Sequence, residues 1–347
     1  MSISAHKTAV VILNYNTADY LQRFLPGLIA SCEGLDAQVV VADNASQDGS
    51  VALMKERFPQ VPLIVLDRNY GFTGGYNRAL AQVEAEYYVL INSDIEVPEG
   101  WLKPLVEWMD SHPECGACGP KLISYYQRDT FEYAGAAGGL LDRYGYPFCR
   151  GRIMQMLEID HGQYDQPADV FWVSGACLMV RSSVWKALGG LDERFFAHME
   201  EIDLCWRLRT MGKSIVCIAQ SCAYHLGGAT LHQGNPRKTF LNFRNNLLML
   251  YKNLPDQELG SVMRVRCFLD YLAAFQFLLT GDVKNFSAVF KARRAYHKMR
   301  PDFEKDRRHI QQLRQNERVP ERVEFSLLWQ YYIKGRKTFN ELMIERK

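Results

Sequence analysis

One stretch in the first third of the chain joins an apolar run to polar side chains that can bind a cation. Tyr87 to Ile91 is a short apolar run, and it ends in Asn92-Ser93-Asp94. Such a run is typical of a strand buried on both faces of a parallel sheet. A carboxylate at its carboxyl end can bind a divalent cation that neutralises the phosphates of a ligand. A plain polar turn is the alternative, because Asn, Ser and Asp are ordinary loop residues.

Two earlier apolar runs end in the same way. Thr8 to Leu13 is followed by Asn14 and Asn16, and Gln38 to Ala42 is followed by Asp43. The carboxyl ends of parallel strands meet at one edge of a sheet, where open α/β proteins bind their ligands. The three polar strand ends therefore predict a pocket for a base, a ribose and a pyrophosphate with its metal.

Segments with helical spacing alternate with these strands. Ala18 to Cys32 and Val51 to Phe58 are predicted helices, and Leu63 to Leu66 is a third short strand. The apolar residues of the helical segments recur at intervals of three and four. Alternation of strands and helices predicts an α/β fold with a parallel sheet and right-handed crossovers.

A glycine-rich segment, Asn69 to Asn77, precedes a predicted helix that runs to Ala85. Gly71, Gly74 and Gly75 allow the backbone to approach a ligand closely, and the N-terminus of the following helix favours an anion. The spacing matches neither the dinucleotide fingerprint nor a P-loop. A phosphate-binding loop and a plain flexible turn both remain open.

Composition bounds the remaining classes. A chain of 347 residues forms one large or two modest domains, and its formal net charge of +2 gives no reason to expect a nucleic-acid partner. Nine scattered cysteines, an odd count, do not resemble a secreted disulfide framework, so we expect a reducing, cytoplasmic compartment. The apolar stretch near the N-terminus is too short for a signal peptide, and no uninterrupted apolar run reaches the roughly 18 residues of a spanning helix.

Five stretches carry a more specific signal, in the order VVILNYN, VVVADNASQDGS, NYGFTGGYNRAL, YYVLINSDIEVPEGWL and VSGACLMVRSSVWKALGGLDERFFAHMEEIDLCWRLRTMGK. In these stretches, which lie within residues 7–232, the chain resembles a family 2 glycosyltransferase of the GT-A fold, and it is closest to the bacterial rhamnosyltransferase-like branch. The resemblance implies a Rossmann-like, mostly parallel sheet flanked by helices in a catalytic domain of residues 1–235. A helical C-terminal region, residues 236–347, follows it.

The resemblance assigns the donor pocket residue by residue. It makes Asp43 the carboxylate that reads the uracil or thymine ring of a nucleotide-diphosphate sugar of the UDP or dTDP type. Other positions are expected to line the same pocket, namely Asn14, Asn16, Asn69, Gly71, Gly74, Gly75, Asn77, Asn92 and Asp94.

A divalent metal, Mn²⁺ or Mg²⁺, is implied as well. Asp94 matches the last carboxylate of the family's DXD metal motif, and His225 matches the histidine that completes the metal site. The first position of the motif is Asn92 rather than Asp, so the metal has fewer acidic ligands than in the family pattern.

A second acidic group, Glu200, Glu201 and Asp203, precedes a predicted helix that continues through Leu208. Acidic residues at this point of a helix are often only partners of its dipole. Transfer of a sugar to a hydroxyl needs a base, and the resemblance places that base at Glu201. Glu200 and Asp203 would then position the acceptor or the base, and Arg207 would hold a carboxylate.

The acceptor side is less defined. Residues 120–170 look like loops, which would form either an acceptor groove or a connector. Phe171 to Val180 is a predicted buried strand, in which Trp172, Ser174 and Gly175 would allow a sugar ring to approach. Simple packing of a glycine-containing strand is the alternative.

The implied function is inverting transfer of a sugar from the nucleotide donor to a hydroxyl of a glycan, free or lipid-linked, in cell-surface polysaccharide or O-antigen synthesis. A nucleotidyltransferase is disfavoured, since no basic glycine-rich signature lies near the first strand. A catalytically silent nucleotide-sugar-binding or scaffold protein remains open. Neither the donor sugar nor the acceptor is readable from these residues.

The composition changes after Arg237. Phe240 to Leu254 and Val265 to Leu279 are strongly apolar predicted helices, and Asp270 interrupts the second. Basic residues follow, namely Lys284, Lys291, Arg293, Arg294, Lys298 and Arg300. Such a region suits peripheral contact with the inner face of the cell membrane. A helical subdomain packed on the sheet or a homodimer contact is the alternative.

Overall fold

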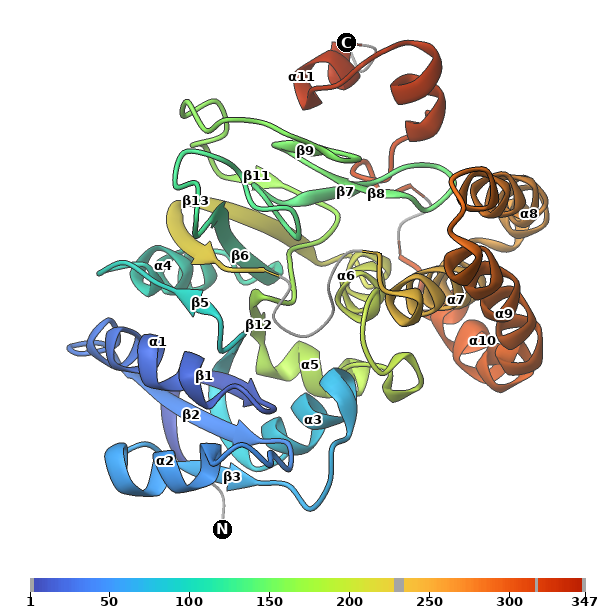
Figure 1. The fold of residues 1–347 in the computed structure, drawn as a ribbon. Coiled ribbons are helices and arrows are strands. Elements are labelled where there is room, and N and C mark those ends of the chain that lie inside the picture. The colour runs from blue at the N-terminus through green and yellow to red at the C-terminus, as the bar shows by residue number, and fades with distance from the viewer. Residues whose placement is uncertain (1–2, 228–233, 316–317, 345–347) are drawn as a thin grey trace.

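One large sheet organises the chain in the computed structural model, which describes residues 3–227, 234–315 and 318–344 (Figure 1). Its strands follow the order β11-β13-β6-β12-β4-β1-β2-β3, with β5 paired to β13. They are β1 (Ile3–Asn14), β2 (Ala37–Asp43), β3 (Leu63–Val65), β4 (Val83–Ile91), β5 (Ile95–Glu96), β6 (Cys115–Ser124), β11 (Ala168–Asp169), β12 (Cys177–Arg181) and β13 (Ser214–His225).

The parallel half of the sheet brings the polar strand ends together. Strands β3, β2, β1 and β4 are parallel neighbours, whereas β12 runs antiparallel to both β4 and β6. Asn14 pairs with Asp43 in the register of β1 and β2, and Ile12 pairs with Ile91 at the end of β4. The predicted α/β fold with its sheet between helices is therefore confirmed.

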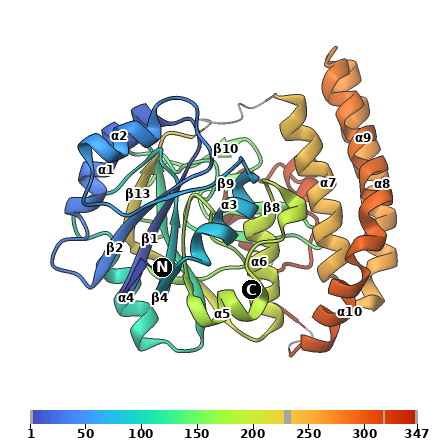
Figure 2. The same cartoon turned by 90° about the horizontal axis from the view of Figure 1, so that it is seen from below.

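Helices cover both faces of this sheet (Figures 1 and 2). One face is covered by α1 (Ala18–Ala30), α2 (Ser50–Arg57) and α4 (Leu102–Ser111), and the other by α3 (Gly71–Leu80), α5 (Ser182–Leu188) and α6 (Glu200–Thr210). Successive side chains of a strand point to opposite faces. Val10 and Ile12 accordingly pack with the first set of helices, and Ala9 and Val11 pack with the second.

Helix α3 begins earlier than predicted. The glycines of residues 71–75 lie inside the helix rather than in a loop before it, and the chain has already entered β4 at Val83. A Cβ atom at Gly75 would lie 2.7 Å from a methyl carbon of Leu13, so this glycine allows α3 to pack closely on β1. Gly75, which was expected to let the backbone approach a ligand, thus allows two elements of the fold to pack closely.

Two predictions between residues 120 and 180 are wrong. The supposed loops contain a second, antiparallel sheet of β7 (Gly139–Leu141), β8 (Pro147–Cys149), β9 (Arg152–Ile153) and β10 (Met156–Leu157). Strands of two or three residues are too short to leave a periodic pattern. The predicted strand from Phe171 begins only at Cys177, because a turn precedes it in which the Cys177 N–H donates to the Ser174 carbonyl.

The C-terminal region is helical, as predicted. It contains α7 (Pro236–Asn253), α8 (Asp256–Leu279), α9 (Val283–Met299), α10 (Glu304–Leu313) and α11 (Phe339–Met343), with shorter turns η2 (Arg300–Phe303) and η3 (Trp329–Ile333). Leu247 and Leu250 of α7 share the hydrophobic core of the second sheet face, and the Val323 N–H donates to the Leu141 carbonyl of β7. None of the helices in the described ranges combines the length and hydropathy needed to cross a membrane. The predicted domain boundary at residue 235 stays a prediction, and residues 1–2, 228–233, 316–317 and 345–347 lie outside the described part.

Candidate active site

The ends of β1 and β2 form a connected polar group. The Asn14 amide donates to Asp43 Oδ2 at 2.8 Å and to Ser46 Oγ at 3.0 Å, and Asp43 Oδ1 accepts the Ser46 N–H at 2.8 Å. Asn14 and Asp43 are both buried, whereas Asn16 is exposed and its side-chain Oδ1 accepts the Gln47 N–H. These three predicted donor residues lie together, with the exposed Asn16 at the rim.

The end of β4 joins the same group through two hydroxyls. Thr17 Oγ1 donates to Asn14 Oδ1 at 2.5 Å and lies 2.8 Å from Ser93 Oγ. Asn92 and Ser93 are half-buried, and the Asn92 N–H donates to the Ala176 carbonyl at 2.9 Å. The three polar strand ends therefore meet at one edge of the sheet.

The glycine-rich segment contacts this edge only in part. The Asn44 amide donates to Asn69 Oδ1 and to the Gly71 carbonyl, which ties the start of α3 to the end of β2. Asn77 points elsewhere, because its side chain donates to the Leu191 carbonyl and accepts the Leu191 N–H. The prediction that Asn77 lines the donor pocket is therefore not supported by its position.

A histidine lies between two carboxylates at the end of β13. His225 Nε2 is 3.3 Å from Asp94 Oδ1, and His225 Nδ1 is 3.3 Å from Glu132 Oε1. Burial disfavours the charged imidazolium, but the two carboxylates outweigh burial and raise the pKa of His225 from 6.5 to about 10. Sequence reasoning placed Asp94 and His225 together and missed Glu132, which is a lone acidic residue in a loop without a motif.

These residues fit part of a divalent metal site. Across the described ranges, no group of three His, Cys, Asp or Glu residues is arranged to hold a metal alone. Asp94 and His225 nevertheless offer one carboxylate and one imidazole in contact, which suits Mn²⁺ if a ligand supplies further oxygens. Glu132 on the far ring nitrogen matches the carboxylate that commonly orients a metal-bound histidine.

The second acidic group lies in the first turn of α6. Glu201 is half-buried, and its Cβ is 3.5 Å from the position that a Cβ at Gly175 would take. The next residue, Ala176, accepts the Asn92 N–H, so one short segment touches both Glu201 and the end of β4. Burial raises the pKa of the Glu201 carboxyl from 4.5 to about 7. A carboxylate with this pKa is matched to proton abstraction near neutral pH.

Glu200 is more deeply buried than Glu201. Its Oε2 atom has no hydrogen-bond partner, and burial followed by the charge of Glu201 raises its pKa well above 4.5. Two neighbouring carboxyl groups in a buried site do not both ionise readily. The charge of either carboxylate therefore disfavours ionisation of the other.

The turn that leads into α6 is strained. Phe196, His198 and Met199 all have positive φ angles, of 68°, 71° and 71°. Bulky residues rarely adopt this conformation, and it persists only where the surroundings enforce it. Here the enforcing residue is Asn245 of α7, whose fully buried amide lies within 3.0 Å of the carbonyls of Phe195, Ala197 and His198.

Asn245→Ala is therefore expected to lower kcat by about tenfold with little change in KM, because the turn that aims Glu201 loses its hydrogen bonds. The buried carbonyls left behind should also lower the free energy of unfolding by about 1–3 kcal/mol. Steady-state kinetics and urea unfolding measure both effects. Asn242→Ala on the same helix is the control, and an equal effect of the two substitutions would contradict this role for Asn245.

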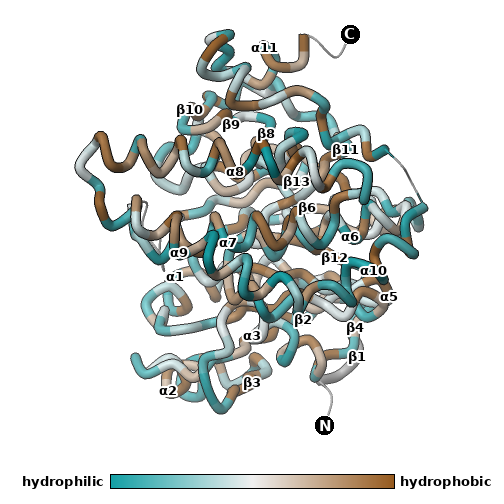
Figure 3. Tube along the Cα trace, turned by 90° about the vertical axis from the view of Figure 1, so that its right-hand side faces the viewer, coloured by the Kyte–Doolittle hydropathy of each residue, from teal (hydrophilic) through white to brown (hydrophobic). Residues whose placement is uncertain are grey.

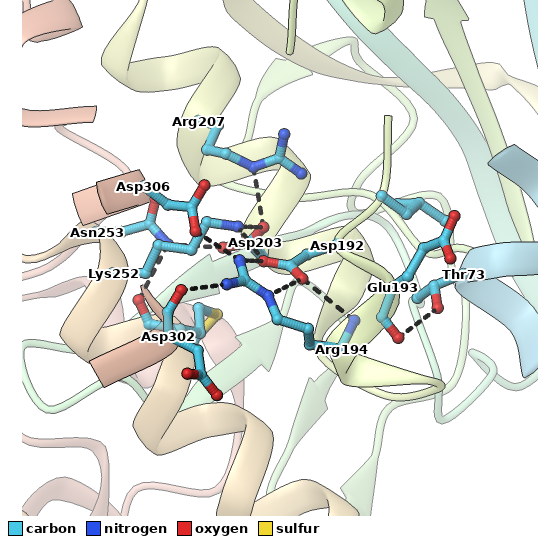
Figure 4. Close-up of polar contacts among 12 residues, drawn as sticks. Thr73, Asp192, Glu193, Arg194, Asp203, Arg207, Lys252, Asn253, Asp302 and Asp306 are labelled. Carbon is cyan, nitrogen blue, oxygen red and sulfur yellow. Dashed lines mark hydrogen bonds and ion pairs between the residues drawn. The ribbon is translucent and has the colours of Figure 1, made fainter. Parts of the chain in front are cut away.

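Asp203 lies in a buried ionic cluster instead of facing a ligand (Figure 4). It is fully buried, and its carboxylate accepts from Arg207 Nε at 2.9 Å, Lys252 Nζ at 2.9 Å and Asn253 Nδ2 at 2.8 Å. The expectation that Arg207 holds a carboxylate agrees with this geometry. The expectation that Asp203 positions the acceptor or the base stays a prediction, and both oxygens of its carboxylate face other side chains.

The cluster extends from α6 to the last long helix. Lys252 also donates to Asp192 at 2.8 Å, and Arg194 bridges Asp192 to Asp306 of α10. Burial opposes ionisation of Asp192, but Arg194 and Lys252 outweigh it and hold the pKa of that carboxyl well below its usual range. A pocket of about 380 Å³ opens beside the cluster, and of the predicted donor residues only Asn77 lines it.

Comparison with known proteins decides the family. The model of glycosyl transferase family 2 matches residues 9–187, which is more than half of the chain. The chain belongs to glycosyl transferase family 2. The predicted family is thereby confirmed, and this family 2 glycosyltransferase is an enzyme of the glycosyltransferase class.

Relatives of this family 2 glycosyltransferase include named bacterial proteins. It is 29% identical over 231 residues to the N-acetylglucosaminyl-diphospho-decaprenol L-rhamnosyltransferase of Mycobacterium tuberculosis, covering 62% of this chain and 75% of the relative. It is 28% identical over 225 residues to the O-antigen biosynthesis protein RfbC of Myxococcus xanthus, covering 63% of this chain and 17% of that much longer protein.

Solved structures share the fold. The Staphylococcus aureus TarS 1–349 structure matches 95% of this chain and 92% of its own, with a TM-score of 0.52 and 16% identity. GalNAc-T7 with UDP, GalNAc and Mn²⁺ matches 71% of this chain and 48% of its own, with a TM-score of 0.54 and 15% identity. At these identities the likeness establishes the fold alone.

The predicted sugar-pocket residues of the glycosyltransferase separate in the structure. Trp172 is buried, its indole N–H donates to the Leu140 carbonyl at 3.1 Å, and its ring packs on Gly139. In the structure Trp172 therefore packs inside the protein, as the alternative interpretation expects. Ser174 is also buried and accepts the Ala176 N–H, whereas Gly175 lies beside Glu201.

Proposed function

We propose that this glycosyltransferase transfers a sugar from a UDP- or dTDP-linked donor to a hydroxyl of a glycan acceptor, with inversion at the anomeric carbon. The observation that carries the proposal is the position of Glu201, whose pKa burial raises to about 7. It stands beside the Gly175–Ala176 segment, which also contacts the end of β4. The proposed base, Glu201, and the sheet edge proposed to bind the donor are thus connected through this short segment.

The donor would lie along the polar strand ends. Asp43, held by Asn14 and Ser46, would accept from the N–H of the uracil or thymine ring, with Asn16 at the rim. Asp94 and His225 would hold a divalent cation together with diphosphate oxygens, and Glu132 would orient the imidazole. The cation, when bound, neutralises charge on the departing diphosphate.

Glu201 would act on the acceptor. Its carboxylate would take the proton of the acceptor hydroxyl while that oxygen bonds to the anomeric carbon and the bond to the diphosphate breaks. A direct displacement of this kind inverts the anomeric centre. Asp203 would serve this step indirectly, because its buried ion pairs fix the first turn of α6.

The acceptor class is proposed from the relatives. One relative is named for rhamnosyl transfer to a diphospho-decaprenol-linked sugar and another for O-antigen biosynthesis. A lipid-linked glycan of cell-surface polysaccharide or O-antigen synthesis is therefore the proposed acceptor. Such an acceptor would be met in the cytoplasm at the inner face of the cell membrane.

The experiment is release of nucleoside diphosphate from a panel of UDP-, dTDP- and GDP-sugars, with a lipid-linked glycan as acceptor. Release should depend on the acceptor, require a UDP or dTDP donor and give the inverted anomer by NMR. Release from GDP-sugars alone, or a retained anomer, would contradict the proposal.

Asp43→Asn tests the base contact within the same assay. We expect the donor KM to rise about tenfold to a hundredfold, since a hydrogen bond to a charged group contributes about 1.5–3 kcal/mol. Asp36→Asn is the control, because that carboxylate is 64% exposed and away from the edge. An unchanged donor KM for Asp43→Asn would remove Asp43 from the donor site.

A further inference from the structure

Helix α8 buries one arginine and one aspartate and exposes large apolar side chains in its second half. Its buried residues recur every four positions, namely Val262, Arg266, Asp270 and Ala274. The buried pair is completed by Arg293 of α9, which donates to Asp270 at 2.6 Å, while Arg266 bonds the other oxygen. The side of α8 that faces the protein core therefore carries this ion pair.

The opposite face of α8 is apolar and exposed. Phe268 is 68% exposed, Phe275 53% and Leu279 72%. Together with nearby exposed residues they form what we call the α8–α9 apolar face, which consists of Phe268, Tyr271, Leu272, Phe275, Leu278, Leu279, Val283 and Phe290. Tyr271 and Phe290 connect the two helices, with ring centroids 5.2 Å apart. Figure 3 shows these helices on the outer side of the molecule.

A continuous face of this kind differs from scattered exposed apolar residues. Single exposed side chains are ordinary, but a contiguous apolar patch marks a surface that meets an apolar partner. The helix also buries a costly ion pair where apolar side chains would pack well. This pattern is typical of a helix whose exposed apolar side contacts a partner.

The charged residues around the α8–α9 apolar face indicate the chemistry of its partner. Lys284, Lys291, Arg294 and Lys298 of α9 are all exposed. Between residues 271 and 300 the one acidic side chain is Asp282, which caps the N-terminus of α9. Aromatic and leucine side chains beside exposed basic residues suit an anionic lipid surface, where the apolar groups enter and the cations bind headgroups.

The hairpin formed by α8 and α9 also contacts the chain between β13 and α7. Asn285 at the tip of the hairpin donates to the Gly234 carbonyl at 3.0 Å. Gly234 precedes α7 and follows the segment that begins after His225. The hairpin tip and the start of α7 lie at the same end of the molecule (Figure 2).

We propose that the α8–α9 apolar face docks this glycosyltransferase onto an anionic lipid bilayer, with α8 and α9 lying along the surface. The purpose assigned to docking, presentation of a lipid-linked acceptor, rests on the proposed function, but the docking itself does not. Binding is measured without any substrate, so a failure of docking and a failure of sugar transfer are distinguishable.

The test is co-sedimentation of the full chain with phosphatidylcholine vesicles, with and without phosphatidylglycerol. The protein should sediment with the anionic vesicles. Phe268→Ser combined with Leu279→Ser should weaken binding by more than about tenfold, because two apolar insertions are lost. Lys284→Glu combined with Lys291→Glu should weaken binding to anionic vesicles by more than about tenfold as well.

Ile159→Ser is the matched control, because Ile159 is 48% exposed and lies outside the face. It should bind like the unaltered protein, and all variants should keep their melting temperature and their activity on a short water-soluble acceptor. Equal binding by the Phe268→Ser, Leu279→Ser variant, or no binding by the unaltered protein, would overturn the proposal. A dimer in light scattering that this double variant dissociates, without vesicle binding, would assign the face to self-association and overturn it too.

Discussion

Glu201→Gln is expected to lower kcat by about 10²–10⁴-fold while the affinity for the donor stays unchanged. This is the usual contribution of a positioned general base, and glutamine keeps the shape of the side chain without its basicity. Donor affinity should survive because the proposed donor contacts come from other residues, namely Asp43, Asp94 and His225. Turnover is measured by nucleoside diphosphate release, and donor binding by calorimetry.

The role of Glu201 also predicts the direction in which kcat changes with pH. A base with a pKa of about 7 must be ionised to act, so kcat of the unaltered enzyme should rise with pH and level off above about 7. The raised pKa also makes the native state more stable when Glu201 is protonated. That stability is complete below 4.5, the usual glutamate value, and is lost as pH rises to about 7.

Two results would contradict the role of Glu201. One is a Glu201→Gln enzyme that retains more than about a tenth of kcat, since a general base contributes at least about 10²-fold. The other is a pH profile of kcat that is flat between 5 and 8. Glu107→Gln serves as the control, because that side chain is 65% exposed and pairs with a surface lysine.

Lys252→Met is expected to lower the free energy of unfolding by about 3–5 kcal/mol, the cost of breaking a buried ion pair from one side. Lys252 is 4% exposed and stands between Asp192 and Asp203, which are both buried side chains. Methionine keeps much of the length of the side chain but leaves Asp203 with Arg207 and Asn253 as its partners. Urea unfolding followed by circular dichroism measures the loss.

Lys103→Met is the matched control for this substitution. Its ammonium lies 3.8 Å from Glu107 on the surface, and both side chains are 65% exposed. Exposed pairs contribute about 0–1 kcal/mol, so the control should change stability by no more than that. If Lys252→Met and Lys103→Met cost the same, the buried cluster does not hold α6 against α7.

The sequence predicted the meeting of the polar strand ends well because it follows from strand order. Asn14, Asp43 and Asn92 each end an apolar run, and parallel strands bring such ends together whatever their distance along the chain. Asp94 and His225 were placed together by the family resemblance alone, because β13 lies far from β4 along the chain. The end of a strand is visible in the local sequence, whereas the pairing of strands that are distant along the chain is not.

The parts that were missed or misplaced depend on long-range contacts. The buried surroundings of Asp203 were missed because nothing local shows that Lys252 and Asn253 of a distant helix bind its carboxylate. For Trp172 the sequence left open whether it meets a sugar ring or simply packs, because its packing partners Gly139 and Leu140 belong to a small sheet that leaves no periodic pattern. Asn245 is one of several asparagines on α7, and no sequence pattern singles it out as the residue that holds the strained turn.

The most direct measurement is the melting temperature of the purified protein with UDP, dTDP, GDP, CDP or NAD, each with and without Mn²⁺ or Mg²⁺. A ligand at about 100 times its dissociation constant stabilises the native state by about 2.7 kcal/mol, which is visible as a raised melting temperature. The account predicts a shift with UDP or dTDP that the metal enlarges and that Asp43→Asn or His225→Ala diminishes. A well-folded protein whose melting temperature no nucleotide changes would contradict the donor site at the ends of β1, β2 and β4.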